Sequence, residues 1–137
     1  MILLDTPVLS EAFRRHRREG PSPTANQLTR LIRNRVDKAV PAIVMQELLT
    51  GVQGPARFDV LRRDIEALGV IPATCEDHAL AAQLVTRCRA RGVTATSVDC
   101  LIAAQAVGMH ARLYTLDRDF DRIASVCGLS LYRPGPG

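Results

Sequence analysis

The chain has 137 residues, 47% of them hydrophobic, with 18 basic and 14 acidic residues and a formal net charge of +4. This length fits one domain with a single substantial core, and the hydrophobic content argues against a disordered chain. No apolar run approaches the roughly 18–20 residues of a membrane span, and no secretory leader is recognisable before Asp5. We therefore expect a cytoplasmic protein with one domain over residues 1–133 and a short flexible tail at 134–137.

The positive charge consists almost entirely of arginine, because Lys38 is the one lysine among the basic residues. Arginine suits bidentate contacts to phosphate, and a moderately basic domain fits a nucleic-acid partner. A coding bias toward arginine and alanine on ordinary solvated helix faces explains the same composition equally well. Charge alone therefore does not decide the partner.

Short apolar runs alternate with helix-like stretches along the whole chain. Runs without polar alternation indicate strands buried on both faces, and we expect them at Ile2–Leu4, Ala39–Ile43, Gly69–Ile71, Arg112–Thr115 and Leu129–Tyr132. This alternation predicts an α/β fold with a largely parallel sheet covered by helices on both faces.

Capping residues mark the expected helix ends. Starts are predicted at Thr6-Pro7, Ser22-Pro23 and Gly54-Pro55, and at Thr96, which stands three residues before Asp99 in a near capping box. Left-handed caps that end helices are expected at Gly20, Gly51, Gly69, Gly92, Gly108 and Gly128.

The cysteines and histidines do not predict a metal site. Cysteines have no finger spacing, and three of the four lie among apolar neighbours, so we expect reduced thiols at Cys75, Cys88, Cys100 and Cys127. The three histidines are scattered, which argues against a histidine-rich zinc site.

The segment Thr96–Val107 is the most informative, because it predicts a helix that is apolar on nearly every side with one acid, Asp99, in its first turn. A buried carboxylate is costly unless it is paired or binds a metal. Asp5, Glu47 and Asp117 also stand at the edges of apolar segments. Because ligands bind at the carboxyl ends of parallel strands, we expect these four acids to gather at one edge of the sheet.

Each acid also has a purely structural interpretation. Asp5 fits a helix cap or a turn, Glu47 a solvated helix face, and Asp99 a capping box. Asp117 and Asp119 fit a helix start favoured by the helix dipole, and Asp121 is most simply a solvated first-turn acid. Separate structural roles would not require all the carboxylates to lie together.

A cluster of carboxylates predicts a definite chemistry. Neighbouring carboxylates repel one another and take up protons unless a cation neutralises them, and oxygen ligands suit Mg²⁺ or Mn²⁺. Such a cation activates water and stabilises charge on a phosphoryl group. Phosphodiester hydrolysis is the natural expectation, because arginines are available for a polyanion. No phosphate-binding glycine loop is present, so the motif for nucleotide binding is missing.

The segments MILLDTPVL, PAIVMQELLTG, SVDCLIAAQA and LYTLDRDFDRIA resemble, in order and spacing, the motifs of PIN-domain nucleases. The resemblance is strongest to the toxin ribonucleases of VapBC-type toxin–antitoxin pairs and runs from Met1 to about Tyr132. It implies a PIN fold, with helices around a mainly parallel sheet of four or five strands. It also implies cleavage of RNA that depends on Mg²⁺ or Mn²⁺.

Carried over position by position, the resemblance makes Asp5, Glu47, Asp99 and Asp117 the catalytic acids. Metal binding would rest on Asp5, Asp99 and Asp117, with Asp119 as a further acid that shares the metal. Glu47 would bind a second ion or orient the attacking water. The hydroxyls that match positions beside the site belong to Thr6 and Thr115, and the sequence departs from the pattern at Pro7.

The resemblance also implies partners: an RNA substrate, a VapB-like antitoxin that blocks the site, and a second copy of the chain in a homodimer. No membrane is expected. The basic cluster of Arg14, Arg15, Arg17 and Arg18 is either a solvated helix end or a contact for RNA or antitoxin. Two alternatives to a nuclease remain: a non-catalytic RNA-binding protein of the same fold, and a metal-dependent phosphatase.

Overall fold

A computed structural model describes residues 1–13 and 20–135. Within these residues the strands are β1 (Ile2–Leu4), β2 (Lys38–Pro41), β3 (Val70–Ile71), β4 (Arg112–Tyr114) and β5 (Ser130–Leu131). The helices there are α1 (Thr6–Ala12), α2 (Pro23–Arg33), α3 (Ala42–Thr50), α4 (Pro55–Ala67), α5 (Cys75–Ala90), α6 (Ser97–Gly108) and α7 (Asp119–Ala124).

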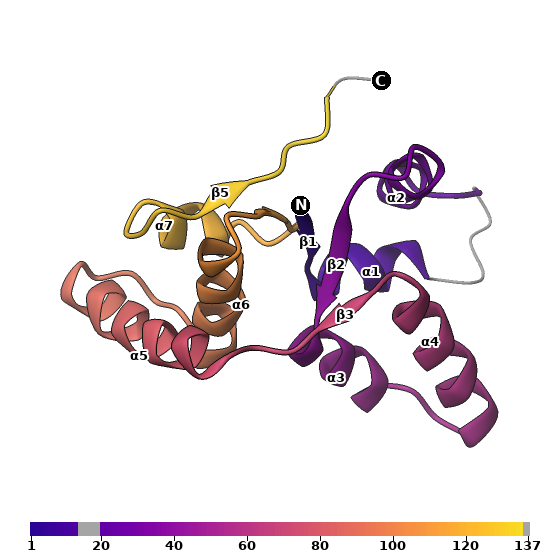
Figure 1. Cartoon of the computed structure of the whole chain (residues 1–137), viewed down its shortest axis with the longest axis horizontal. Helices are drawn as coiled ribbons and strands as arrows, with labels where there is room; N and C mark the ends of the chain where they lie inside the picture. Colours follow the sequence, from indigo (N-terminus) through magenta and orange to yellow (C-terminus); the bar gives the residue numbers. More distant parts are fainter. Residues whose placement is uncertain (14–19, 136–137) are drawn as a thin grey trace.

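All strand pairs are parallel, and the order across the sheet is β3-β2-β1-β4-β5. Helices α1–α4 lie on one side of the sheet and α5–α7 on the other (Figure 1). The central strand β1 is enclosed between them, since Ile2, Leu3 and Leu4 are at most 1% exposed. The predicted α/β class with a parallel sheet covered on both faces is therefore confirmed.

The topology brings distant parts of the chain to one edge of the sheet. Parallel strands end at the same edge, so the residues that follow β1, β2 and β4 meet there. Asp5 follows β1 directly, α3 begins immediately after β2, and Thr115 follows β4. Helix α6 returns toward the start of β4, so its first turn, which holds Asp99, lies at this edge too.

Side-chain caps start several helices as the sequence predicts. Ser22 accepts a hydrogen bond from the backbone N–H of Ala25, at 3.0 Å, to begin α2. Thr96 begins α6 in the same way. Helix α1 starts one residue earlier than expected, because Asp5 and not Thr6 is its N-cap. The strand β1 leads into the helix with no intervening loop, which places the acid itself at the cap.

Some local predictions are wrong. The strand expected over Ala39–Ile43 ends at Pro41, where α3 begins. Among the glycines expected as left-handed caps, Gly20, Gly69 and Gly92 have positive φ, whereas Gly51, Gly108 and Gly128 do not. Helix α6 includes Gly108, and His110 (φ 52°) takes the left-handed position beyond it. The backbone N–H of Ala111 then bonds to the Ala106 carbonyl at 2.9 Å, which completes a Schellman motif.

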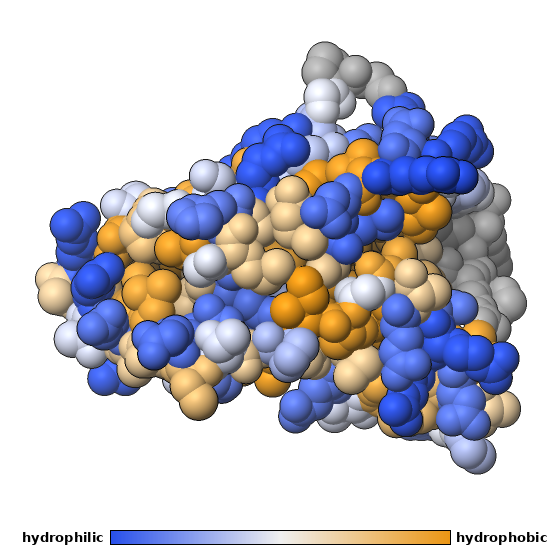
Figure 2. Space-filling view, viewed as in Figure 1, coloured by the Kyte–Doolittle hydropathy of each residue, from blue (hydrophilic) through white to orange (hydrophobic). Residues whose placement is uncertain are grey.

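The cysteines, the helix lengths and the surface bear on what the composition predicts. The four cysteines are free, with Cys88 and Cys100 buried. In the described part of the chain, no helix is long and apolar enough to cross a membrane. The arginine cluster at residues 14–18 lies outside the described residues. On the face drawn in Figure 2, hydrophilic side chains are spread over the surface and alternate with apolar ones, so hydropathy marks no single binding patch there.

Candidate active site

Asp5 is the most enclosed of the predicted acids. It is 3% exposed, because it follows the central strand into the edge of the core. Its Oδ1 accepts a hydrogen bond from the backbone N–H of Thr6 at 2.8 Å, and its Oδ2 accepts one from the Thr115 hydroxyl at 2.6 Å. These two bonds fix the orientation of the carboxylate and tie the end of β1 to the end of β4.

Two threonine hydroxyls connect Asp5 to other acids. The Thr115 oxygen that donates to Asp5 also accepts from the backbone N–H of Asp117, at 3.0 Å. On the opposite side of Asp5, the Thr6 hydroxyl donates to Oε1 of Glu47 at 2.9 Å. Hydrogen bonds thus run from α3, past the ends of β1 and β4, to the loop before α7.

Asp117 and Asp119 lie at the far end of this hydrogen-bonded series. Asp117 is half-buried, and its Oδ1 accepts from the backbone N–H of Asp119 at 2.9 Å. Asp119 is exposed at the first position of α7. Asp121, two residues further on, is an exposed first-turn acid paired with Arg133. The structure therefore joins Asp119 to the group and leaves Asp121 with the surface role that the sequence indicates.

Asp99 occupies the first turn of a helix that is otherwise largely interior. The buried residues of α6 are Cys100, Ile102, Ala103, Ala104, Gln105 and Ala106. Asp99 is half-buried, and its backbone N–H donates to the Thr96 hydroxyl at 3.0 Å. The apolar helix is thus buried as predicted, and its single carboxylate stands at the end that meets the sheet edge.

Burial dominates the electrostatics of the site. The pKa of Asp5 is raised from 3.8 to about 6, and burial is the largest cause. Hydrogen bonds from Thr115 and Thr6 oppose the rise, and the negative charges of Asp99 and Glu47 add to it. The pKa of Asp99 is also raised, first by burial. Hydrogen bonding to Thr96 opposes that rise, and the charges of Asp117 and Asp119 add to it. All five acids are therefore linked by hydrogen bonds or by charge.

The ligand atoms of the site suit a metal ion, whereas the positions of the side chains do not. The five acids offer only oxygen ligands, which suits a hard divalent cation. Within residues 1–13 and 20–135, however, no three Asp, Glu, His or Cys side chains are arranged so that they could hold a metal ion. Both Asp5 oxygens and Oδ1 of Asp117 accept hydrogen bonds from protein donors, and each keeps a second lone pair. Binding of a shared cation would require the carboxylates to change their arrangement.

Comparison with known proteins agrees with the fold and identifies the family. The PIN domain family model matches residues 2–126. VapC ribonuclease Mb1587 of Mycobacterium bovis is 33% identical over 135 residues, covering 94% of this chain and 96% of that protein, and Ribonuclease VapC11 of Mycobacterium tuberculosis matches equally. The chain belongs to the PIN-domain family, among the VapC ribonucleases. Its motifs around Asp5, Glu47, Asp99 and Asp117 are thus carried by a chain that matches the family over nearly its whole length.

Solved structures give the same result for the fold of this PIN domain. FitAcB from Neisseria gonorrhoeae superposes with a TM-score of 0.74 at 25% identity, covering 97% of each chain. VapBC2 from Rickettsia felis, solved bound to a DNA fragment from its own promoter, gives a TM-score of 0.77 at 24% identity, covering 96% of this chain and 98% of that one. The PIN fold expected from the sequence is confirmed.

Several features beside the acids escape the sequence interpretation. A pocket between α2, the loop after β4 and the chain end after β5 adjoins Asp117, and no local pattern announces it. Thr74 and Asp77 form a complete capping box at the start of α5, which their spacing makes legible. Asp77 is buried by this role, so an enclosed carboxylate in this fold is not by itself a sign of a metal site.

Proposed function

We propose that this chain is a divalent-metal-dependent endoribonuclease and the toxin of a type II toxin–antitoxin pair. The observation that carries the proposal is the linkage of five acids at one sheet edge in a chain 33% identical to proteins named VapC ribonucleases. The proposed substrate, cellular RNA, lies in the cytoplasm, and we propose that the chain acts there.

The metal would be held chiefly by Asp5, Asp99 and Asp117, with Asp119 beside them. The fit rests on their oxygen chemistry and on the raised pKa values of Asp5 and Asp99, because a cation would relieve the repulsion that contributes to both. Bound Mg²⁺ or Mn²⁺ supplies an activated water and neutralises charge on the phosphate. Thr115 holds Asp5 in place through its hydroxyl and is therefore a positioning residue.

Glu47 has a different task from the buried acids. It is exposed, and Thr6 holds only its Oε1, so Oε2 has no partner in the hydrogen bonds described for it. An exposed carboxylate in one orientation suits the acceptance of a hydrogen bond from the attacking water and then of its proton. We propose this role for Glu47, with Thr6 as its positioning residue.

Two protein partners belong to the proposal. The similar solved structures include VapBC proteins and a toxin–antitoxin complex from Klebsiella pneumoniae, which supports a VapB-like antitoxin for this chain. A largely apolar hollow of about 500 Å³ between α3 and α4, lined by Met45, Leu49 and Phe58 among others, suits an amphipathic helix of such a partner. A homodimer is expected from the family. Light scattering of the purified chain tests it, and copurification with the product of a short adjacent reading frame, lost in Phe58→Asp, tests the antitoxin.

The decisive experiment measures RNA cleavage by the purified chain with Mg²⁺, with Mn²⁺ and with EDTA. We expect cleavage with either metal, no cleavage in EDTA, and a loss of about a hundredfold or more in Asp99→Asn. The matched control is Asp64→Asn, which makes the same charge change at an exposed position on α4, away from the sheet edge. It should cleave as the parent does.

Each alternative function predicts a different outcome. RNA binding that survives EDTA, without cleavage, would identify a non-catalytic RNA-binding protein. Turnover of p-nitrophenyl phosphate with RNA left intact would identify a phosphatase. Equal loss of cleavage in Asp64→Asn and Asp99→Asn would show that net charge and not the acid group is responsible.

A further inference from the structure

A pocket of about 560 Å³ opens beside the acids, between α2, the loop after β4 and the segment after β5. Two aromatic rings belong to its lining: Tyr114 and Tyr132 meet edge to face, with ring centroids 5.1 Å apart and planes at 60°. Arg112, which does not line the pocket, lies 5.0 Å from the centroid of the Tyr132 ring. This cation–π contact helps to hold the ring in position.

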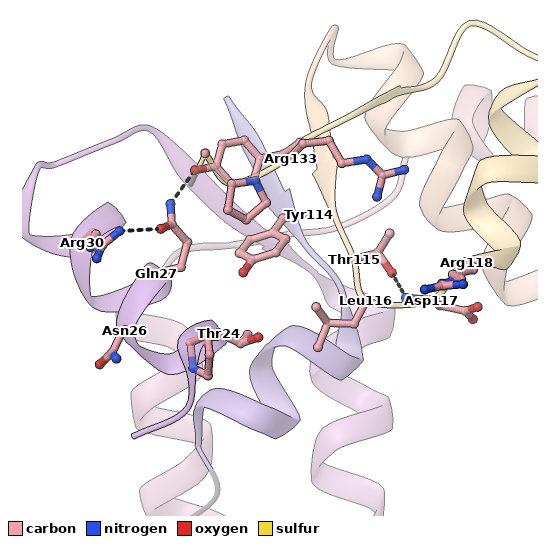
Figure 3. A pocket seen from close by; sticks show the side chains of 14 residues that line it. Thr24, Asn26, Gln27, Arg30, Tyr114, Thr115, Leu116, Asp117, Arg118 and Arg133 are labelled. Carbon is pink, nitrogen blue, oxygen red and sulfur yellow. Dashed lines mark hydrogen bonds between the residues drawn. The ribbon is translucent and has the colours of Figure 1, made fainter. Parts of the chain in front are cut away.

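Polar side chains from α2 complete the opposite wall. Nε2 of Gln27 donates to the Tyr132 hydroxyl at 2.6 Å, and Arg30 donates to Oε1 of Gln27 at 3.5 Å. Figure 3 shows Tyr114 between these α2 side chains and the loop that carries Asp117. The pocket therefore has one accessible aromatic ring, that of the half-buried Tyr132, together with an amide that is held in a defined orientation.

Charge and position connect this pocket to the acid group. Three arginines line it, Arg30, Arg118 and Arg133, and Arg133 is paired with Asp121 outside the lining. The single carboxylate in the lining is that of Asp117. Thr115 also lines the pocket, and it is the residue whose hydroxyl holds Asp5. A polyanion that passes the acids can therefore continue directly into a pocket with cationic walls.

We infer that this pocket binds an unpaired nucleotide of the RNA substrate, next to the bond that is cleaved. The volume lies within the range of small-ligand sites, which is roughly 300–1,000 Å³. Unpaired bases bind proteins by stacking on aromatic rings and by hydrogen bonds to their edges. Tyr132, which is half-buried, provides the ring, and the buried Tyr114 supports it from behind. Gln27 provides an amide for the base edge, and Arg30 and Arg118 contact the flanking phosphates. This inference rests on the proposed function, because it concerns the same substrate.

The test compares pocket and off-pocket substitutions on the same helix. The full chain carrying Asp99→Asn, kept in EDTA, binds fluorescein-labelled single-stranded oligoribonucleotides, and fluorescence anisotropy gives Kd. We expect Gln27→Ala and Arg30→Ala to weaken binding about five- to tenfold each. The matched control is Arg33→Ala, which removes the same charge from α2 at an exposed residue that does not line the pocket. We expect it to weaken binding no more than about twofold.

A second arm asks whether a base occupies the pocket. A single abasic nucleotide is moved position by position along the oligoribonucleotide. At one position it should weaken binding about tenfold in the parent, and less than about twofold in Gln27→Ala, because contacting groups are not additive. Should Gln27→Ala prevent folding, Tyr132→Phe removes only the hydroxyl that Gln27 contacts and replaces it in both arms.

The outcomes separate this inference from the proposed function. If the parent cleaves RNA but Gln27→Ala and Arg30→Ala bind RNA as Arg33→Ala does, the pocket does not bind RNA. If Gln27→Ala and Arg30→Ala weaken only the inhibition of the chain by a protein partner, the pocket is a peptide site and the inference is wrong. If the loss of affinity caused by the abasic nucleotide is as large in Gln27→Ala as in the parent, no base enters the pocket. If no RNA is cleaved, the proposed function fails, and the binding comparison still decides the pocket.

Discussion

Replacement of Asp5 by asparagine should make the folded protein relatively more stable as the pH rises. Asp5 is almost completely enclosed, and its pKa in the folded state is about 6 against an ordinary value of 3.8. The carboxyl group therefore adds no penalty below about pH 3.8, where it is protonated in both states. The stability of the parent relative to the variant is lost as the pH rises through about 6.

The size of the effect follows from the shift. A rise of about two pKa units corresponds to about 3 kcal/mol of unfolding free energy at pH 7.5. Asparagine cannot accept from both Thr6 and Thr115 with two oxygens, which costs about 1 kcal/mol at every pH. That cost cancels when the difference between the two proteins is compared across pH. Removal of the Asp5 charge also relieves Asp99 and acts in the same direction.

Urea unfolding of both proteins, in EDTA at pH 4 and at pH 7.5 and followed by circular dichroism, measures this difference. We expect Asp5→Asn to gain about 2.5 kcal/mol on the parent between the two pH values, because part of the full effect is already present at pH 4. Other titrating groups are common to both proteins and largely cancel. A change below about 1 kcal/mol would refute the reasoning that enclosure of the charged carboxylate is costly here.

Three further predictions concern the same edge and the helices behind it. Mg²⁺ at about 100 times its Kd should raise the unfolding free energy of the parent by about 2.7 kcal/mol, and that of Asp99→Asn by much less. If Mg²⁺ shifts the thermal melts of both proteins equally, Asp99 is not part of a metal site. Gly108→Ala should destabilise by about 1–2 kcal/mol, because its Cβ would lie 2.8 Å from an oxygen of the α5 capping box. The control is Gly128→Ala, whose added Cβ would meet open space and should not destabilise the protein. If the two variants unfold at similar urea concentrations, the predicted clash at Gly108 is wrong. Thr115→Val removes a hydrogen bond that lowers the pKa of Asp5, so the loss of stability that depends on Asp5 should move to higher pH. If the pH of that loss is the same in Thr115→Val as in the parent, the hydrogen bond does not hold down the pKa of Asp5.

The parts of the fold that the sequence predicts are those set by long apolar runs. Strands such as Ile2–Leu4 read clearly because every residue is buried, and parallel topology then brings their ends to one edge. This is why the sequence alone groups Asp5 and Asp117, which are far apart in the chain. The apolar pattern does not fix the residue at which an element ends, so it extends β2 past the start of α3 at Ala42 and leaves both Asp5 and Thr6 as candidates for the first helix cap.

Features that depend on packing between distant segments could not be predicted. Gln27 and Tyr132, which close the pocket beside the acids, are 105 residues apart and carry no shared motif. The orientation of each carboxylate depends on donors such as Thr115, whose hydroxyl meets Asp5 only in the folded sheet. Sequence patterns thus identify the acids and their common edge, whereas hydrogen-bond partners and the neighbouring pocket follow from tertiary structure.

The bond between Thr115 and Asp5 has a consequence for the synthesis of the protein. The two residues are 110 positions apart, and β1 has β4 as its direct neighbour in the sheet. A contact of this sequence separation forms only after most of the chain has been made, because domains fold as the ribosome releases them. The nascent chain therefore lacks an assembled acid group until the residues of β4 have emerged. Even a ribonuclease made among its own potential substrates would then stay inactive while it is being translated.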